Sequence, residues 1–217
     1  MKRLLPFLTF LLPALAAAQP SSYEERQRTF GSVVAPAALP SGAMAFYGFA
    51  GVPDVGAGFR QGTSIVELEA RARVNYLLLS LALEVATRRI VIDTGDFTLA
   101  PSLALGLVFG TGSTYFDESN FAAVSFRILP GVVASWPAGE TVRVLGLVDL
   151  PIDLAFSPSG SQRVKLLAGG GLELYLGQDV SLLAAAQLGP EFVKQALAVT
   201  ETRVGYQLRL GLGFRIF

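Results

Sequence analysis

The chain has 217 residues, neither cysteine nor histidine, a formal net charge of +0 and 52% hydrophobic residues. The missing residue types exclude a disulfide framework, a thiol nucleophile, a serine–histidine–aspartate triad and metal sites with cysteine or histidine ligands, and no cofactor is expected. The neutral net charge argues against nucleic-acid binding, and the apolar content is too high for a disordered chain. A chain of this length fits a single domain.

The N-terminal segment is typical of a secretory signal peptide. Lys2 and Arg3 precede an apolar stretch at residues 4–15, and three alanines end the segment. This order of basic, apolar and small residues predicts export and cleavage. The apolar stretch is also shorter than the about 20 residues that a membrane-spanning helix needs. We therefore expect a signal peptide at residues 1–18 and, because prolines are frequent there, a loose periplasmic lead-in at residues 19–42.

Alternation with a period of two is the main signal in the rest of the chain. Over residues 97–110, large apolar residues stand at odd positions and small or polar residues stand at even positions. Such alternation predicts a β-strand with two different faces. The pattern recurs along the chain and predicts ten spans. They lie at residues 43–51, 54–60, 63–74, 77–91, 97–110, 121–136, 141–154, 163–176, 179–189 and 202–217.

These spans are long, and their two faces differ in kind. Most run for about 11–15 residues, whereas strands of globular proteins commonly have about 5–6. One face is apolar throughout, and the other mixes charged residues with glycine, alanine and serine. Membrane-spanning strands with a lipid side and a lumen side have this character, and they must close because unpaired backbone groups cannot face lipid. The prediction for residues 43–217 is an all-β fold, a closed antiparallel up-and-down transmembrane β-barrel.

Three details refine this prediction. The first two spans, the second of which is rich in glycine, either belong to a barrel of ten strands or form an irregular lead-in to eight strands. Pro130 and Gly131 interrupt the sixth span, where the loss of an amide donor predicts a β-bulge at which the two faces can exchange. Aromatic residues gather near the predicted strand ends, as in the interfacial girdles of membrane barrels. They are Phe97, Phe109, Tyr115, Phe116, Phe121, Trp136, Phe156, Tyr206 and Phe214.

The connections between the spans alternate in length. Tight turns at residues 93–96, 137–140 and 177–179 separate the longer connections. Outer-membrane barrels have short periplasmic turns and longer external loops, so this order places the C-terminus on the periplasmic side. Connections carry binding function more often than the scaffold does. An external ligand or partner is therefore expected at the three longer loops, at residues 111–120, 155–162 and 190–201.

The alternating spans, the turn rhythm and the C-terminal sequence Gly-Leu-Gly-Phe-Arg-Ile-Phe resemble those of small bacterial outer-membrane β-barrel proteins. The resemblance covers about residues 43–217 and the signal peptide. It implies a Gram-negative outer-membrane location, contact with outer-membrane lipid, and assembly by the barrel-assembly machinery through a signal formed by Phe214, Ile216 and Phe217. The terminal aromatic residue of the family usually shares the apolar face, whereas Phe217 has the parity of Arg215.

Charged residues on the second face are the best functional candidates. Both signs are present, which favours an interior filled by paired charges, since small barrels have interiors that side chains can fill. A narrow polar pore and an acid/base cluster are the alternatives. The candidate residues are Glu67, Glu69, Arg71, Arg73, Glu84, Arg127, Arg143, Asp149, Lys165, Glu173, Arg203, Arg209 and Arg215.

Evidence for an enzyme is weak. Asp93-Thr94-Gly95 resembles the motif of aspartic proteases, but a single copy between two strands is better explained as a hairpin turn. Omptin proteases, outer-membrane phospholipases and lipid A deacylases rely on histidine, which the chain lacks. We therefore expect a non-enzymatic outer-membrane barrel with a structural or loop-mediated role. A narrow passive pore is one alternative, and the other is a soluble exported barrel that binds an apolar ligand and has the faces inverted.

Overall fold

The computed structural model describes residues 39, 41–112, 122–157, 159–176, 179–195 and 200–216. These residues form strands joined by turns, and none of them belongs to a helix long and apolar enough to cross a membrane. The signal-peptide prediction, most of the lead-in, most of the loop at 111–120 and Phe217 lie outside the described residues. The strands are β1 (Met44–Val52), β2 (Asp54–Gly62), β3 (Glu67–Asn75), β4 (Ser80–Arg88), β5 (Ile92–Asp93), β6 (Thr98–Thr111), β7 (Ala122–Pro137), β8 (Val142–Asp149), β9 (Ile152–Ser157), β10 (Gln162–Lys165), β11 (Leu167–Tyr175), β12 (Val180–Lys194) and β13 (Glu201–Arg215).

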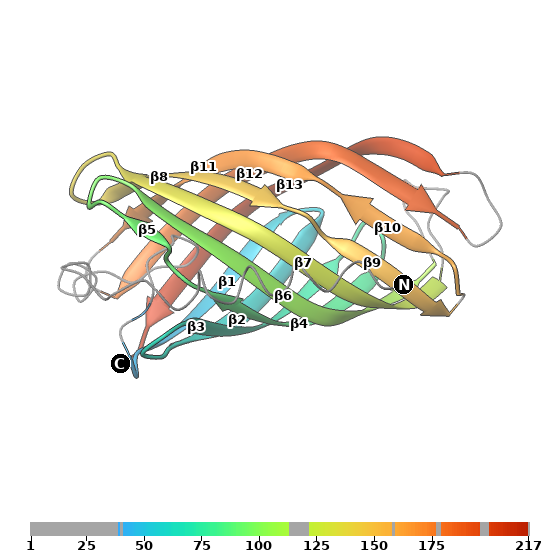
Figure 1. The fold of residues 1–217 in the computed structure, drawn as a ribbon, viewed down its shortest axis with the longest axis horizontal. Coiled ribbons are helices and arrows are strands. Elements are labelled where there is room, and N and C mark those ends of the chain that lie inside the picture. The colour runs from blue at the N-terminus through green and yellow to red at the C-terminus, as the bar shows by residue number, and fades with distance from the viewer. Residues whose placement is uncertain are drawn as a thin grey trace.

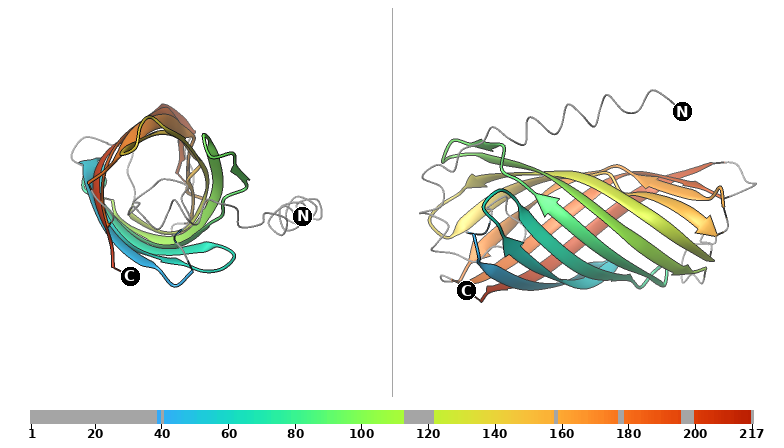
Figure 2. Two further views of the ribbon diagram at one scale, coloured as in Figure 1. Left: turned by 90° about the vertical axis from the view of Figure 1, so that its left-hand side faces the viewer. Right: turned by 60° about the horizontal axis from the view of Figure 1, so that its bottom comes forward.

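The strands close into a single antiparallel barrel. β1 to β4 pair in chain order, β4 pairs with β6, β6 pairs with β7, and β11, β12 and β13 pair in chain order. β13 pairs with β1 over nearly the whole length of β1, which closes the sheet. Viewed along its axis, the ribbon forms a closed ring, and the side views show the strands strongly tilted (Figures 1 and 2). The predicted all-β, closed, up-and-down antiparallel barrel is confirmed.

The described part of the barrel wall has ten strands. β8 and β9 are two halves of one strand, since both pair with β7, and β10 and β11 form another interrupted strand beside β12. β5 is a two-residue extension of the hairpin before β6. The glycine-rich β2 is a full member between β1 and β3, so the count is ten rather than eight.

We name the two ends of the barrel the terminal end and the loop end. The terminal end is where β1 begins and β13 ends, and it also holds the turns after β2, β4, β7 and β11. At the loop end lie the remaining turns, including the one at Pro53 between β1 and β2 and the connections after β6, β9 and β12. Two of the predicted loops are shorter than expected, because β9 extends to Ser157 and β12 extends to Lys194. The predicted loops at 155–162 and 190–201 therefore narrow to residues 158–161 and 195–200.

The prediction of a bulge with exchanged faces at Pro130 is wrong. β7 runs without a break through this position, and odd-numbered residues face inward on both sides of it, with Leu129 and Val133 both buried. The interruption falls in the partner strand instead, at Leu150 and Pro151 between β8 and β9. A proline is tolerated in β7 because the neighbouring ladder is already open at that point.

Three prolines lie in a row across four neighbouring strands at this height. The Leu150 amide donates to the Pro130 carbonyl at 2.9 Å, and the Lys165 amide donates to the Pro151 carbonyl at 2.9 Å. The next amide, that of Leu166 between β10 and β11, donates to the Pro190 carbonyl in β12 at 3.0 Å. The carbonyl group of each proline accepts a hydrogen bond, but its nitrogen has no hydrogen to donate. This explains why the strand made of β8 and β9 and the strand made of β10 and β11 are both interrupted along this row.

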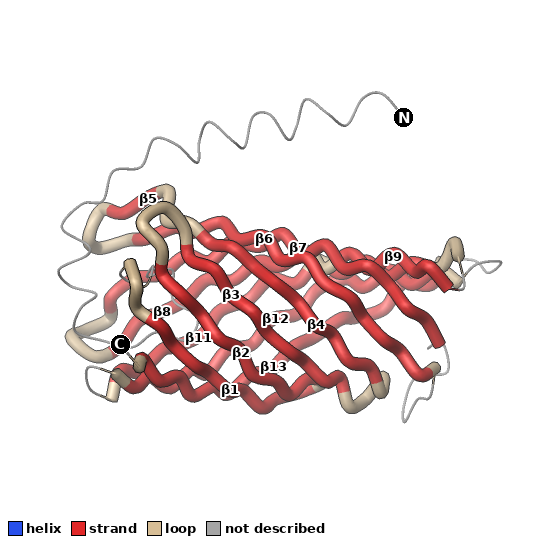
Figure 3. The backbone as a smooth tube through the Cα atoms, turned by 90° about the horizontal axis from the view of Figure 1, so that it is seen from below, coloured by secondary structure: helices blue, strands red, loops and turns tan. Residues whose placement is uncertain are grey.

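The outer face of the wall is apolar, whereas the charged side chains lie on the inner face. Figure 3 shows the backbone of the tilted strands, and the large apolar side chains exposed on their outer face are mainly leucine, valine, isoleucine and phenylalanine, with Leu210 68% exposed. On the described barrel strands, the one charged side chain at an outward position is Lys194, the last residue of β12. Long strands, a closed wall and an apolar exterior together are the architecture of a transmembrane β-barrel.

Aromatic side chains gather toward both ends of this exterior. Phe97 packs against Trp136 with ring centroids 5.3 Å apart, and Phe46 packs against Phe59 at 4.9 Å, both near the terminal end. Phe109 and Phe156 are exposed near the loop end. Three aromatic residues of the predicted girdle, Tyr115, Phe116 and Phe121, lie outside the described residues.

The candidate site is the barrel lumen

All the predicted lumen charges are at inward positions of the barrel wall. Glu67, Glu69, Arg73, Glu84 and Glu173 are buried. The remaining ones are half-buried, and they are Arg71, Arg127, Arg143, Asp149, Lys165, Arg203, Arg209 and Arg215. The structure does not gather them at one point. It divides them into a main network and several smaller groups along the lumen.

Glu84 on β4 is the centre of the main network. Its side chain has 0% exposure, and it accepts hydrogen bonds from the guanidinium groups of Arg71 and Arg73 on β3. A third guanidinium, that of Arg127 on β7, reaches the same carboxylate at 3.1 Å. Three cations from two strands thus converge on one buried anion, which satisfies the carboxylate fully and leaves no room for substrate at it.

The network continues toward both ends of the lumen. Toward the loop end, Arg127 makes a bidentate pair with Asp153 on β9, with distances of 2.6 and 2.7 Å. Toward the terminal end, Arg71 contacts Glu69 at 3.2 Å, and Arg88 on β4 lies 3.8 Å from both Glu69 and Glu67. The bidentate Arg127–Asp153 pair has the strong geometry for arginine and carboxylate groups, whereas Arg88 contributes only longer-range attraction to the two glutamates.

A fully buried ion pair closes the network at the terminal end. The Nε and Nη2 atoms of Arg60 donate to the two oxygens of Glu67 at 2.6 and 2.7 Å, and the two side chains are 0% and 1% exposed. The amide of Leu39, from the predicted lead-in, donates to the same carboxylate at 3.4 Å. Leu39 packs there with Ala43 and Ala45, so the start of the described chain covers this pair.

The other charged residues form smaller groups. Arg163 and Lys165 both lie 3.1 Å from Glu191 on β12. Arg209 on β13 donates to Gln187 at 2.7 Å and lies 3.6 Å from Asp149. Arg143 donates to Ser135, and Glu173 lies within 3.4 Å of the Tyr175 hydroxyl. At the two ends, Arg203 pairs with Glu201 and Arg215 pairs with Asp179.

The charged lumen residues that the sequence analysis did not predict include Arg60, Arg88, Asp153, Arg163 and Glu191. Arg88, Asp153 and Arg163 have the same parity as predicted lumen residues on their own spans, so extending the alternation would have found them. Arg60 lies on the glycine-rich second span, for which the sequence does not decide between a barrel strand and an irregular lead-in. Glu191 follows Pro190 in a segment predicted to be a loop.

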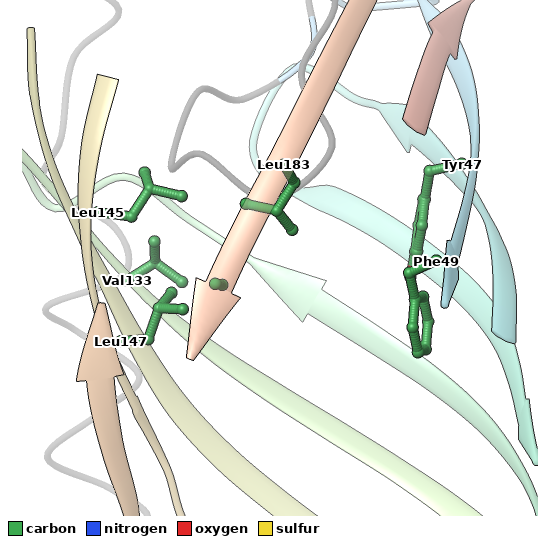
Figure 4. Packing of buried hydrophobic residues seen from close by; sticks show 7 residues of the cluster. Tyr47, Phe49, Val133, Leu145, Leu147 and Leu183 are labelled. Atoms are coloured by element: carbon green, nitrogen blue, oxygen red, sulfur yellow. The ribbon is translucent and has the colours of Figure 1, made fainter. Parts of the chain in front are cut away.

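The opposite part of the lumen is apolar. Leu145, Val133 and Leu147 lie on one wall, Tyr47 and Phe49 lie on the other, and Leu183 stands between them (Figure 4). Tyr47 also has a polar contact, since its hydroxyl donates to Glu69 and so joins the apolar cluster to the ion-pair network. The lumen is therefore closed by apolar packing on one side and by ion pairs on the other.

Glycines of β2 make room for the two rings of β1. A Cβ atom at Gly58 would lie 2.5 Å from Cζ of Tyr47, and one at Gly56 would lie 2.7 Å from Cζ of Phe49. The side chains of β1 thus lie flat over a strand that lacks inward side chains at these positions. This packing gives the glycine-rich span a structural role in the barrel wall.

We expect the Gly58→Ala variant to be destabilised by about 1–3 kcal/mol, because an added methyl group in a packed site displaces the Tyr47 ring from its bond with Glu69. Urea unfolding of the refolded barrel measures this change. Gly48→Ala is the matched control, since its new Cβ would face outward with its nearest neighbour, the Gly56 carbonyl oxygen, 3.8 Å away. Equal midpoints for the two variants would contradict the packing role of Gly58.

Two small cavities remain in the lumen. One, of about 60 Å³, is lined by Glu69, Arg88, Ser102, Leu183 and neighbouring residues toward the terminal end. The other, of about 80 Å³, is lined by Pro53, Ser125, Asp153, Lys165 and neighbouring residues toward the loop end. Both are of a size that holds a few water molecules, and neither is a passage for larger solutes.

The chain is only distantly similar to known proteins. No protein-family model matches the chain, and no curated protein matches it. Among solved structures, two similar chains are a KdgM porin in complex with disordered oligogalacturonate and a KdgM porin. Each is 8% identical and the match covers 81% of this chain and 99% of the porin chain, with TM-scores of 0.43 and 0.42. Similarity at this level does not identify a function.

The two features considered for catalysis have structural roles. The Asp93 carboxylate accepts a hydrogen bond from the amide of Gly95 at 3.0 Å, and Gly95 has a φ of 85°, so this motif forms an Asx-type turn. Glu67 and Glu69, the paired lumen acids, are each held by arginine side chains. Neither acid faces a cavity without a cationic partner beside it.

Proposed function

We propose that this protein is an integral outer-membrane β-barrel without enzymatic activity, whose lumen is largely filled by paired charged side chains. The observation that carries the proposal is the sorting of polarity across a closed wall. Charged groups face the lumen and pair there, while the exterior is apolar over the length of the long strands. This arrangement is stable in lipid, where the exterior needs no hydration and the backbone has no open edge.

The orientation of the side chains argues against the soluble alternative. A water-soluble barrel that binds an apolar ligand needs charges outside and large apolar residues inside. Here Leu188, Val204 and Leu210 are each more than two-thirds exposed on the outer face. An exposed apolar surface of this extent marks a contact with lipid or with another protein.

The filled lumen favours a structural or loop-mediated role over a passive pore. The ion-pair network runs from Arg60 near the terminal end to Asp153 toward the loop end, and the apolar cluster faces it. We therefore propose that any external ligand or partner contacts the loop end, at the connections after β6, β9 and β12. Export by a cleaved signal peptide and assembly through the C-terminal strand, where Phe214 and Ile216 face outward, belong to the same proposal.

A detergent gel and a planar bilayer test this proposal together. The protein from isolated outer membranes is expected to migrate differently before and after boiling, because a closed membrane barrel stays folded in the detergent. In a planar bilayer it is expected to show no stable open-channel conductance. A protein that remains soluble without detergent would overturn the membrane assignment, and a large stable conductance would favour the pore alternative.

A further inference from the structure

We propose that the Arg73 side chain is the partition between the two small spaces that remain in the filled lumen, so that removing it joins them. This inference deepens the proposed function and rests on its membrane location. Arg73 lines the cavity toward the terminal end and also the cavity toward the loop end, and it is common to both linings among the described residues. Its side chain therefore stands between two spaces.

The two spaces lie on one line through the barrel. The terminal-side cavity extends to Glu67 and Arg88, the first residue of β3 and the last of β4. The loop-side cavity extends to Pro53, in the turn between β1 and β2, and to Asn75, the last residue of β3 at the loop end. Removing the separation between the two cavities would join them into one narrow space.

Arg73 is held in place from one side. Its Nη2 atom donates to Glu84, whereas its buried Nε atom has no hydrogen-bond partner among the described residues. Glu84 also holds Arg71 and Arg127, so the carboxylate stays paired when Arg73 is removed. The wall of the barrel can therefore survive the loss of this one guanidinium, which makes the partition testable.

The first experiment compares single-channel conductance of the wild type, Arg73→Ala and Arg88→Ala in planar bilayers. Arg88 is the matched control because it is another inward arginine that lines the terminal-side cavity alone. Arg73→Ala is expected to conduct small ions at least severalfold better than the wild type, Arg88→Ala is expected to stay near the wild type, and Arg73→Lys is expected to remain closed. The boiled and unboiled gel shift shows separately that each variant is a folded barrel.

Two results would overturn the partition while leaving the proposed membrane barrel intact. One is equal conductance of folded Arg73→Ala and folded Arg88→Ala. The other is a wild type that already conducts as well as Arg73→Ala. Failure of the wild type to shift on the gel would instead count against the proposed function itself.

A second measurement reports on each cavity separately. The chain has no cysteine, so Ser102→Cys in the terminal-side cavity and Ser125→Cys in the loop-side cavity are unique thiols. The barrel is placed in sealed vesicles, and a small water-soluble thiol reagent that does not cross the bilayer is added on the loop-end side only. Adding Arg73→Ala is expected to raise the labelling rate of Cys at position 102 severalfold and to leave that at position 125 nearly unchanged. An unchanged rate at position 102 would overturn the proposal even if no conductance is seen.

Discussion

Replacing Leu208 with arginine is expected to lower the free energy of unfolding in a bilayer by about 2–4 kcal/mol, the cost of a charged side chain on the lipid face of a barrel near the bilayer midplane. Leu208 is at the middle of β13, is 50% exposed on the outer face, and pairs with Val52 of β1 and Ala186 of β12. Among the described residues, no acidic side chain lies on the outer face near Leu208 that could pair with the new cation. Urea unfolding of the protein folded into lipid vesicles measures the change.

Thr202→Arg is the control for Leu208→Arg. Thr202 is also exposed on β13, but it lies beside the start of the strand, at the loop end. The cost there is expected to be about 0–1 kcal/mol, since the penalty falls toward the membrane interface. If both variants have the same stability, the exterior of the barrel faces water rather than lipid at the centre of β13.

Replacing Glu84 with alanine is expected to destabilise the barrel by about 3–5 kcal/mol, because it leaves buried cations without their shared partner. Arg71, Arg73 and Arg127 all contact this carboxylate from β3 and β7, so the loss affects both sides of β4. Glu84→Gln keeps the shape and removes the charge, and we expect it to lie between the wild type and Glu84→Ala. Unfolding midpoints in urea, measured in one lipid, rank the three proteins.

Glu201→Ala serves as the matched control for the loss of an acid. Glu201 pairs with Arg203 at 3.2 Å, but its side chain is 53% exposed at the loop end. An exposed pair contributes about 0–1 kcal/mol. Equal effects of Glu84→Ala and Glu201→Ala would show that the main network does not hold the barrel together, and the filled lumen would lose its structural role.

The barrel could be predicted from the sequence because its wall obeys a strict period of two. In β13 the outward residues from Val204 to Phe214 are apolar or aromatic, and the inward ones include Arg203 and Arg209. A shift by one residue would place arginine in lipid, so the physical chemistry allows a single register. The same argument placed every predicted lumen charge on the inward face.

The boundaries and the pairing partners could not be predicted in this way. Pro190 resembled the start of a loop, yet it lies inside β12, opposite Val204 and beside the interruption between β10 and β11. Which carboxylate meets which guanidinium depends on strands far apart in the chain, as for Glu84 and Arg127. Alternation assigns a face to a residue, but it says nothing about the height at which residues of different strands meet.

The row of prolines gives the barrel wall a line of reduced lateral bonding. Along it, Pro130, Pro151 and Pro190 offer carbonyl groups but no amide hydrogens, so neighbouring strands are joined there by fewer bonds than in a regular ladder. A change in the cross-section of the barrel therefore breaks fewer backbone hydrogen bonds at that height than it would across a regular ladder. β7 and β12 run through the row without interruption, so the wall stays continuous there while β8–β9 and β10–β11 do not.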